Sequence, residues 1–237
     1  FGVAGSVALL FAGLGIQSSV GGVPKRQFQE ILSYELIVAK KTNASYQESK
    51  ELTNRLAKSD IKDYRAIYSK VIEASLKNGH DKQTVTMLVT DCADFSPFVS
   101  LRSFKQGESL SLKKGVIISS KLAQLAQVTV GDRLTLDGHS FKVAGITENY
   151  VGHFIYMDQA SYQKIYGKRT SANSYLVQLK NPSTRQVQAV SRDMMNLAAV
   201  KAVRQNASMI SLFTSVAKSL DKTMMILVVV SILLAIV

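Results

Sequence analysis

The most constraining feature of the sequence is the absence of charge at both of its ends. The first 24 residues contain no charged side chain, and neither do the last 15, from Thr223 to Val237. A helix that crosses a bilayer needs about 20 apolar residues, because the hydrocarbon core is about 30 Å thick and each residue rises about 1.5 Å. We therefore expect residues 1–24 to form one transmembrane helix and residues 207–237 to form a stalk helix that enters a second one.

Each apolar run also has a less specific explanation. The first resembles a secretory signal peptide, but no basic segment precedes its apolar part. The last resembles a buried core helix, but the run VVVSILLAIV has no polar face. Both predicted spans are somewhat short. We therefore expect two truncated membrane helices in a piece of a longer membrane protein. The stalk is expected to be an unbroken helix, because residues 207–222 contain no Pro or Gly.

The roughly 200 residues between the two runs are then expected on one side of the membrane. They carry all the charge of the chain, a net +12 from 29 Lys and Arg against 17 Asp and Glu. This charge favours anionic surroundings such as lipid headgroups or acidic wall polymers, although a solvated basic surface explains it equally well. We expect no nucleic-acid partner, because no basic-aromatic repeat or known binding motif occurs. The charge does not show on which side of the membrane the domain lies.

The pattern of the middle section predicts an α+β fold in two parts. Residues 25–95 read as strand, helix, strand and strand, and residues 171–206 repeat a strand-helix-strand pattern. Between them, residues 96–170 read as an inserted β-rich subdomain. The predicted fold is a split extracytoplasmic domain between two transmembrane helices, with no prediction of the strand order.

Short local signals place the elements within these parts. Ser45 and Glu48 form a capping box before a helix, and Ser119 or Ser120 is expected to cap a second helix. Asn78-Gly79 and Asp137-Gly138 predict tight hairpins. A further short helix is expected to begin after Asp158 and to end at Gly167.

The sequence offers no catalytic arrangement. The three histidines, His80, His139 and His153, are scattered along the chain, and no GxSxG, HExxH or P-loop signature occurs. Gly21-Gly22 is not followed by the residues of a phosphate-binding loop. We predict no catalytic, cofactor-binding or metal-binding residues, no cofactor, and no enzymatic activity for this chain.

Two other groups of residues have alternative interpretations. Asp91, Cys92 and Asp94 form a small acidic cluster that could bind a cation, although a loop after a strand explains them as well. Cys92, the sole cysteine, is expected to be a small apolar residue in a core strand, without a disulfide partner. The aromatic residues of ENYVGHFIYM could form an exposed patch for a partner. We favour inward packing instead, because Tyr150, Phe154 and Tyr156 share one face at period two.

Two stretches resemble a known family. GVIISSKLAQLAQVTVGDRLTL and FKVAGITENYVGHFIYM are similar to the extracytoplasmic core domain of MacB/FtsX-like ABC transporter permeases. The matching motifs are Thr129-Val130-Gly131-Asp132 and Val143-Ala144-Gly145-Ile146. The opening FGVAGSVALLFAGLGIQSSV and the ending SLDKTMMILVVVSILLAIV resemble the membrane helices that flank this domain. ENYVGHFIYM is similar to the large permeases of Firmicutes, which contain two such membrane units.

The resemblance implies a mechanical role in the cell membrane. In this family a separate cytoplasmic ATPase hydrolyses ATP, and the permease transmits the motion to an outer domain that acts on a substrate or partner. Family members act on lipoproteins, antimicrobial peptides or cell-wall hydrolases, and permeases pair as dimers around the ATPase. The main alternative is a ligand-binding sensor domain of a two-helix signalling receptor, which also lies between two spans; a membrane-anchored hydrolase is a third. Residues following Val237 would distinguish permease from sensor, since only a permease continues into further spans.

Overall fold

The computed structural model describes residues 26–75, 82–92, 94–104 and 107–206, with a few positions in the terminal segments (5, 8, 11, 15, 215, 218, 219, 222–226 and 228–230). The predicted transmembrane helix 1–24, the stalk 207–237 and the turn Asn78-Gly79 lie wholly or largely outside these residues. Within the part of the chain that is described, no helix is long and apolar enough to cross a membrane.

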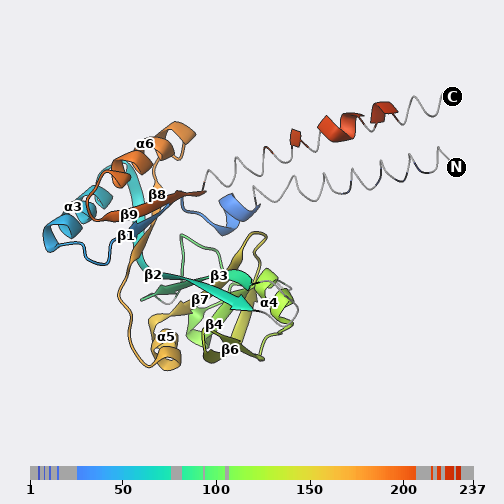
Figure 1. The fold of residues 1–237 in the computed structure, drawn as a ribbon, viewed down its shortest axis with the longest axis horizontal. Coiled ribbons are helices and arrows are strands. Elements are labelled where there is room, and N and C mark those ends of the chain that lie inside the picture. The colour runs from blue at the N-terminus through green and yellow to red at the C-terminus, as the bar shows by residue number, and fades with distance from the viewer. Residues whose placement is uncertain are drawn as a thin grey trace.

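The described residues form a mixed α+β domain, the fold class that the sequence predicts. Their strands make one nine-stranded sheet, which the sequence did not predict (Figure 1). The sheet order is β5-β6-β4-β7-β3-β2-β8-β1-β9. The strands are β1 (Leu36–Lys40), β2 (Ile61–Ser75), β3 (Lys82–Thr90), β4 (Val116–Ser119), β5 (Arg133–Leu136), β6 (His139–Thr147), β7 (His153–Asp158), β8 (Ser174–Leu179) and β9 (Val200–Gln205). The helices are α3 (Tyr46–Leu56), α4 (Ser120–Ala126), α5 (Gln159–Tyr166) and α6 (Thr184–Met195), with a π-helical turn η1 (Arg26–Ile31) and a 3-10 turn η2 (Leu112–Lys114).

One end of the sheet is a split β-α-β-β-α-β arrangement. Its strands lie in the order β9-β1-β8-β2, and every neighbouring pair is antiparallel. Helix α3 connects β1 to β2, and α6 connects β8 to β9. The rest of the sheet is built from the residues between β2 and β8. There β3 pairs with β7, and β4 with β6, in parallel.

Strand β2 joins the two ends of the sheet without interruption. It is 15 residues long. Residues from Ile61 to Ile67 pair with β8, and residues from Tyr68 to Ser75 pair with β3. The prediction that residues 96–170 form a separate inserted subdomain stays a prediction. The strands of these residues belong to the same continuous sheet as those on either side of them in the sequence.

The buried apolar residues of the described part of the chain form three clusters on the two faces of the sheet. On one face, α3 and α6 cover one cluster and α4 and α5 cover another (Figure 1). Alternate side chains of β2 lie on this face, since Tyr64 and Tyr68 pack against these clusters. The opposite face carries the central cluster, which contains Ile37, Ile67, Leu88, Ile117 and Leu176 from five strands. Strands β1, β3, β4 and β8 are therefore buried on both faces.

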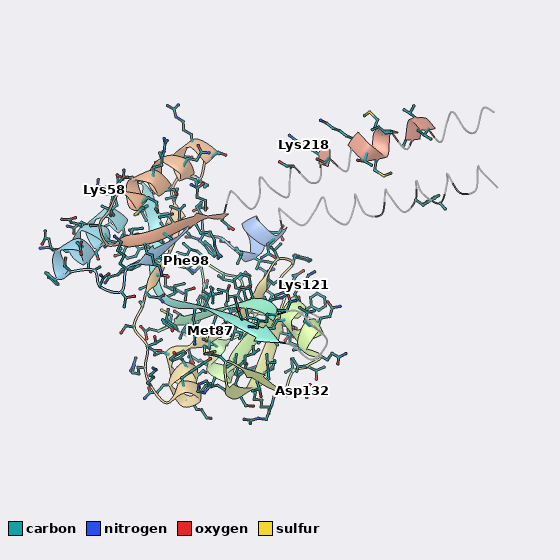
Figure 2. All side chains as sticks on the ribbon, in the orientation of Figure 1. Lys58, Met87, Phe98, Lys121, Asp132 and Lys218 are labelled. Atoms are coloured by element: carbon teal, nitrogen blue, oxygen red, sulfur yellow. The ribbon has the colours of Figure 1, made fainter. Side chains whose placement is uncertain are left out.

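Irregular chain covers the central cluster. Phe95 and Phe98 are fully buried in it, and the Arg65 guanidinium lies 5.2 Å from the centroid of the Phe98 ring. Figure 2 shows Phe98 between the α3–α6 end of the molecule and the α4–α5 end, whereas Met87 lies within the latter. The loop after β3 thus fills the space between the two ends of the sheet.

Several local predictions are confirmed. Ser45 and Glu48 form the capping box of α3, and Ser119 caps α4. Helix α5 begins after Asp158 and ends at Gly167, whose φ is 72°. Asp137 and Gly138 both have positive φ, 53° and 75°, as a type I′ hairpin requires.

Candidate functional site

The two flanking segments join the domain at one place, which we call the junction and define as residues 27–35 together with Asn206. Asn206 directly follows β9 and is 9% exposed. Its backbone N–H donates to the carbonyl of Glu35 at 2.8 Å. Its side-chain Nδ2 donates to the carbonyls of Leu32 and Tyr34 at 3.3 and 3.0 Å. One amide side chain therefore holds the entering and the leaving chain together.

The entering chain is also tied to the loops that cover the central cluster. Gln27 is fully buried, and its Oε1 accepts a hydrogen bond from the backbone N–H of Tyr150 at 2.6 Å. Leu32 forms an antiparallel bridge with Val99. The Ser33 N–H donates to the Phe98 carbonyl at 2.8 Å. The junction is thereby attached to both halves of the molecule.

Two polar side chains complete the junction from the β1–β8 side. Gln178 Nε2 donates to the carbonyls of Ser33 and Pro97 at 2.5 and 3.3 Å. Glu35 Oε2 accepts from the backbone N–H of Leu179 at 2.7 Å. Burial raises the pKa of the Glu35 carboxyl above its ordinary value, although the bond from Leu179 acts in the opposite direction.

A pocket of about 250 Å³ lies beside the junction, between the two ends of the sheet. Its walls come from four strands and from the segments before β1, before β7 and after β9: Leu32, Tyr34, Ile37, Thr84, Thr86, Val151, Gly152, His153, Phe154, Arg204, Gln205 and Asn206. Burial raises the pKa of Tyr34, whereas the charge of Arg204 and a hydrogen bond with it lower that pKa. Burial, with a smaller contribution from Lys121, lowers the pKa of His153. The surface of the pocket is mainly apolar, and Arg204 brings a cation to it.

A family model described as the MacB-like periplasmic core domain matches residues 1–197. The chain belongs to this family. The resemblance inferred from the sequence is thereby confirmed, and the chain contains the extracytoplasmic core domain of a MacB-like ABC transporter permease. Comparison with curated proteins gave no match.

Two solved structures resemble this MacB-like domain at low sequence identity. The periplasmic region of MacB from Actinobacillus actinomycetemcomitans is 10% identical with a TM-score of 0.44, and the match covers 79% of this chain and 95% of that one. The extracellular domain of the noncanonic ABC-type transporter YknZ from Gram-positive bacteria is 14% identical with a TM-score of 0.41. That match covers 73% of this chain and 98% of the other.

The residues singled out for metal chemistry lie apart in this MacB-like domain. His80 is outside the described residues. His139 packs against the Tyr166 ring, with 4.2 Å between ring centroids, and His153 lines the pocket. Asp91 pairs with Arg169 at 3.6 Å, and Asp94 Oδ1 accepts from the Ser96 N–H at 3.1 Å. Within the described residues, no three His, Cys, Asp or Glu side chains are grouped as a metal ion would need.

The expectation for Cys92 was wrong. Strand β3 ends at Thr90, and Cys92 lies beyond it with an exposed thiol. The Thr90 hydroxyl accepts a hydrogen bond from the Cys92 N–H at 3.2 Å, which turns the chain away from the sheet. The cysteine therefore lies outside the core strand that its apolar neighbours predict for it.

The aromatic residues pack inward, as expected. Phe154 and Tyr156 are buried in the central cluster with their rings stacked, 5.8 Å between centroids. Tyr150 precedes β7 and packs against the same cluster. The residues that sequence reasoning missed are the amides of the junction. Of these, Gln178 has a signal, a polar side chain in the apolar strand SYLVQL, whereas Gln27 and Asn206 have none.

Proposed function

We propose that this chain is the mechanical part of an ABC transporter permease, which couples ATP hydrolysis on a separate cytoplasmic subunit to movement of its outer domain. The outer domain would then act on a substrate or partner outside the cell, in export, in lipoprotein or peptide handling, or in control of a cell-wall hydrolase. The observation that carries the proposal is the junction, where the side chain of Asn206 binds the entering chain at Leu32 and Tyr34.

This junction suits the transmission of force. A displacement of either flanking segment acts directly on Asn206, and from there on β1 and β9, which pair with each other. Strand β2 extends from this end of the sheet to the other without a break. A push at the junction is therefore expected to move the domain as a unit, because closely packed interiors deform little.

The membrane location is part of the same proposal. The described positions of the terminal segments include highly exposed apolar side chains: Phe11, Met225, Ile226, Val229 and Val230. Exposed apolar surface of this kind favours contact with lipid or with another helix. We infer a multi-pass protein of the cell membrane with an extracellular central domain.

The partners follow from the family. The proposal includes a cytoplasmic ABC ATPase, a second copy of the permease, and membrane lipid, with an outer protein or peptide as a further partner. We propose that the chain itself is not an enzyme. Membership of the MacB-like family favours the permease over the two-helix sensor.

The test measures motion of the outer domain in the assembled transporter. Cys92 is exposed and is the only cysteine in these 237 residues, so it accepts one spin label. The full-length permease, with any other cysteines replaced, is reconstituted with its ATPase. Electron paramagnetic resonance then measures the distance between the two Cys92 labels of a dimer. We expect two distance distributions, one without nucleotide and one with ATP and vanadate.

An ATPase variant that binds ATP but cannot hydrolyse it is the control for turnover. With that variant the labels should stop in the ATP-bound distribution and fail to return. A distance that is the same in every nucleotide state would contradict the proposal, and so would a permease that does not associate with any ABC ATPase.

A further inference from the structure

The pocket beside the junction has the size and lining of a ligand site. Its volume is about 250 Å³, and an apolar cavity of about 150 Å³ is known to hold a benzene molecule. Leu32, Ile37, Val151 and Phe154 give it apolar walls. The space therefore suits a hydrocarbon chain of medium length.

The charge of the pocket is suited to an anion. Arg204 lines it and lies opposite Ile37 of the neighbouring strand, and none of the described lining residues is acidic. A guanidinium forms strong, often bidentate hydrogen bonds with a carboxylate. The imidazole of His153 does not take part, because His153 lies opposite Val85 and shares the face of the sheet that α4 and α5 cover.

The walls come from both ends of the sheet. Ile37 and Arg204 belong to β1 and β9, whereas Thr86 and Phe154 belong to β3 and β7. A bound molecule would therefore contact both ends at once, next to the hydrogen bonds of Asn206.

We propose that this pocket binds a small free amphiphile with a carboxylate head and an unbranched acyl chain. The chain lies between Ile37 and Phe154, and the carboxylate pairs with Arg204. The inference goes beyond the proposed function and does not depend on it, since binding requires only the folded domain.

Octanoate is the probe. It is titrated calorimetrically into residues 1–237 in phosphatidylcholine nanodiscs, and the heat from empty nanodiscs is subtracted. We expect saturable binding at one site per chain. Octanol, which lacks the charge, and butanoate, which lacks the chain, should each bind at least about tenfold more weakly, because each loses one of the two interactions.

Two pairs of variants locate the site. Arg204→Gln should weaken octanoate binding about tenfold, whereas Lys201→Gln, an exposed cation on the same strand, should leave it unchanged. Thr86→Phe places a ring in the pocket and should abolish binding, whereas Thr86→Val keeps the volume and should preserve it. Circular dichroism checks the fold of each variant, and if Thr86→Phe unfolds, the Arg204→Gln pair and the octanol comparison decide.

Three results would overturn the inference. The first is octanoate heat equal to that of empty nanodiscs. The second is an affinity for octanol equal to that for octanoate, which would remove the role of the charge. The third is unchanged binding in a folded Thr86→Phe variant, which would place the ligand elsewhere.

Discussion

At the scale of single residues, one buried arginine organises the helical layer over β1 and β8. Arg55, at the end of α3, is 7% exposed. Its Nη1 and Nη2 donate to the two carboxylate oxygens of Asp60 at 3.0 and 2.9 Å, and its Nε donates to Asp193 on α6. A buried guanidinium needs such partners, because an unpaired charge away from water is costly. The arginine therefore holds α3, the turn before β2 and α6 together.

The pH dependence of this contact is our first prediction. Burial raises the pKa of Asp60, but the hydrogen bonds and charge of Arg55 outweigh burial, so that pKa lies below its ordinary value of 3.8. A lowered folded-state pKa stabilises the protein above pH 3.8, and this stabilisation is lost as the pH falls through the folded-state value. Asp60→Asn should therefore cost about 1–3 kcal/mol at pH 7 and little well below pH 3.8.

Thermal unfolding followed by circular dichroism at pH 7 and in acid checks this difference. Glu51→Gln is the matched control, since Glu51 is an exposed carboxylate on α3. An Asp60→Asn variant that is equally destabilised at both pH values would show that the effect is steric and not electrostatic.

Asn206 carries the second prediction. Asn206→Leu keeps the approximate size of the side chain but removes both donors to the carbonyls of Leu32 and Tyr34. We expect a loss of about 1–3 kcal/mol in the free energy of unfolding, because two buried acceptors lose their partner. In the reconstituted permease the same variant should reduce the nucleotide-dependent change in the Cys92–Cys92 distance.

Asn196→Leu is the control, since Asn196 is an exposed amide after α6. It should leave the free energy of unfolding and the distance change near the wild-type values. If a folded Asn206→Leu variant showed a nucleotide-dependent distance change as large as that of the wild type, the hydrogen bonds of Asn206 would not be needed for force transmission.

At the scale of elements, the point where β2 changes partner depends on one side chain. The Ser69 N–H donates to Asn173 Oδ1 at 2.8 Å, and Asn173 Nδ2 donates to the Ser69 carbonyl at 2.9 Å. The amide thereby takes the place of a neighbouring strand just beyond Ile67, the last residue that pairs with β8. Asn173→Ala should accelerate amide hydrogen exchange around Ser69 at least about tenfold, since the lost bonds expose this backbone to local opening.

Exchange measured by mass spectrometry on the peptide that contains Ser69 checks this prediction. The exposed Asn181→Ala is the control, and exchange in α6 should stay unchanged in both variants. Faster exchange throughout the domain would indicate general destabilisation and would contradict a local role for Asn173.

The elements that sequence reasoning predicted are those with short-range causes. The capping box at Ser45, the cap at Asp158 and the turn at Asp137-Gly138 depend on atoms a few residues apart, so the local sequence is enough to indicate them. Cys92 was misplaced because β3 ends at Thr90, and the hydrogen bond from the Cys92 N–H to the Thr90 hydroxyl beyond that end leaves no mark in the apolar pattern.

Long-range pairing is the part that the sequence did not reveal. The parallel register of Val85 with His153 joins residues 68 positions apart, and no pattern near either strand specifies it. The junction has the same difficulty, because Asn206 becomes significant only when folding brings it to Leu32. The candidate site could therefore be recognised only from the structure, whereas the fold class could be predicted from the sequence.

At the scale of the whole molecule, charge and apolar surface are separated. The charged residues all lie between Lys25 and Lys222, and the domain between the flanking segments has three apolar clusters of its own. Most of the described apolar side chains of the terminal segments, such as Met225 and Ile226, are instead exposed, whereas Met224 is buried. We therefore expect residues 26–206 to fold without the flanking segments, which need lipid.

The last prediction tests that separation directly. Residues 26–206 expressed alone should elute from size-exclusion chromatography in plain buffer as a single symmetrical peak, because the apolar clusters of this segment are closed by its own helices and loops. Residues 1–237 should aggregate in the same buffer and become monodisperse only in detergent or nanodiscs, because exposed apolar surface associates in water. The thermal midpoint of the shorter chain should stay within a few degrees of that of the longer chain in nanodiscs, since the central packing is common to both. A longer chain that is monodisperse in plain buffer would mean that its uncharged segments pack against the domain, and the membrane assignment would then have to be abandoned.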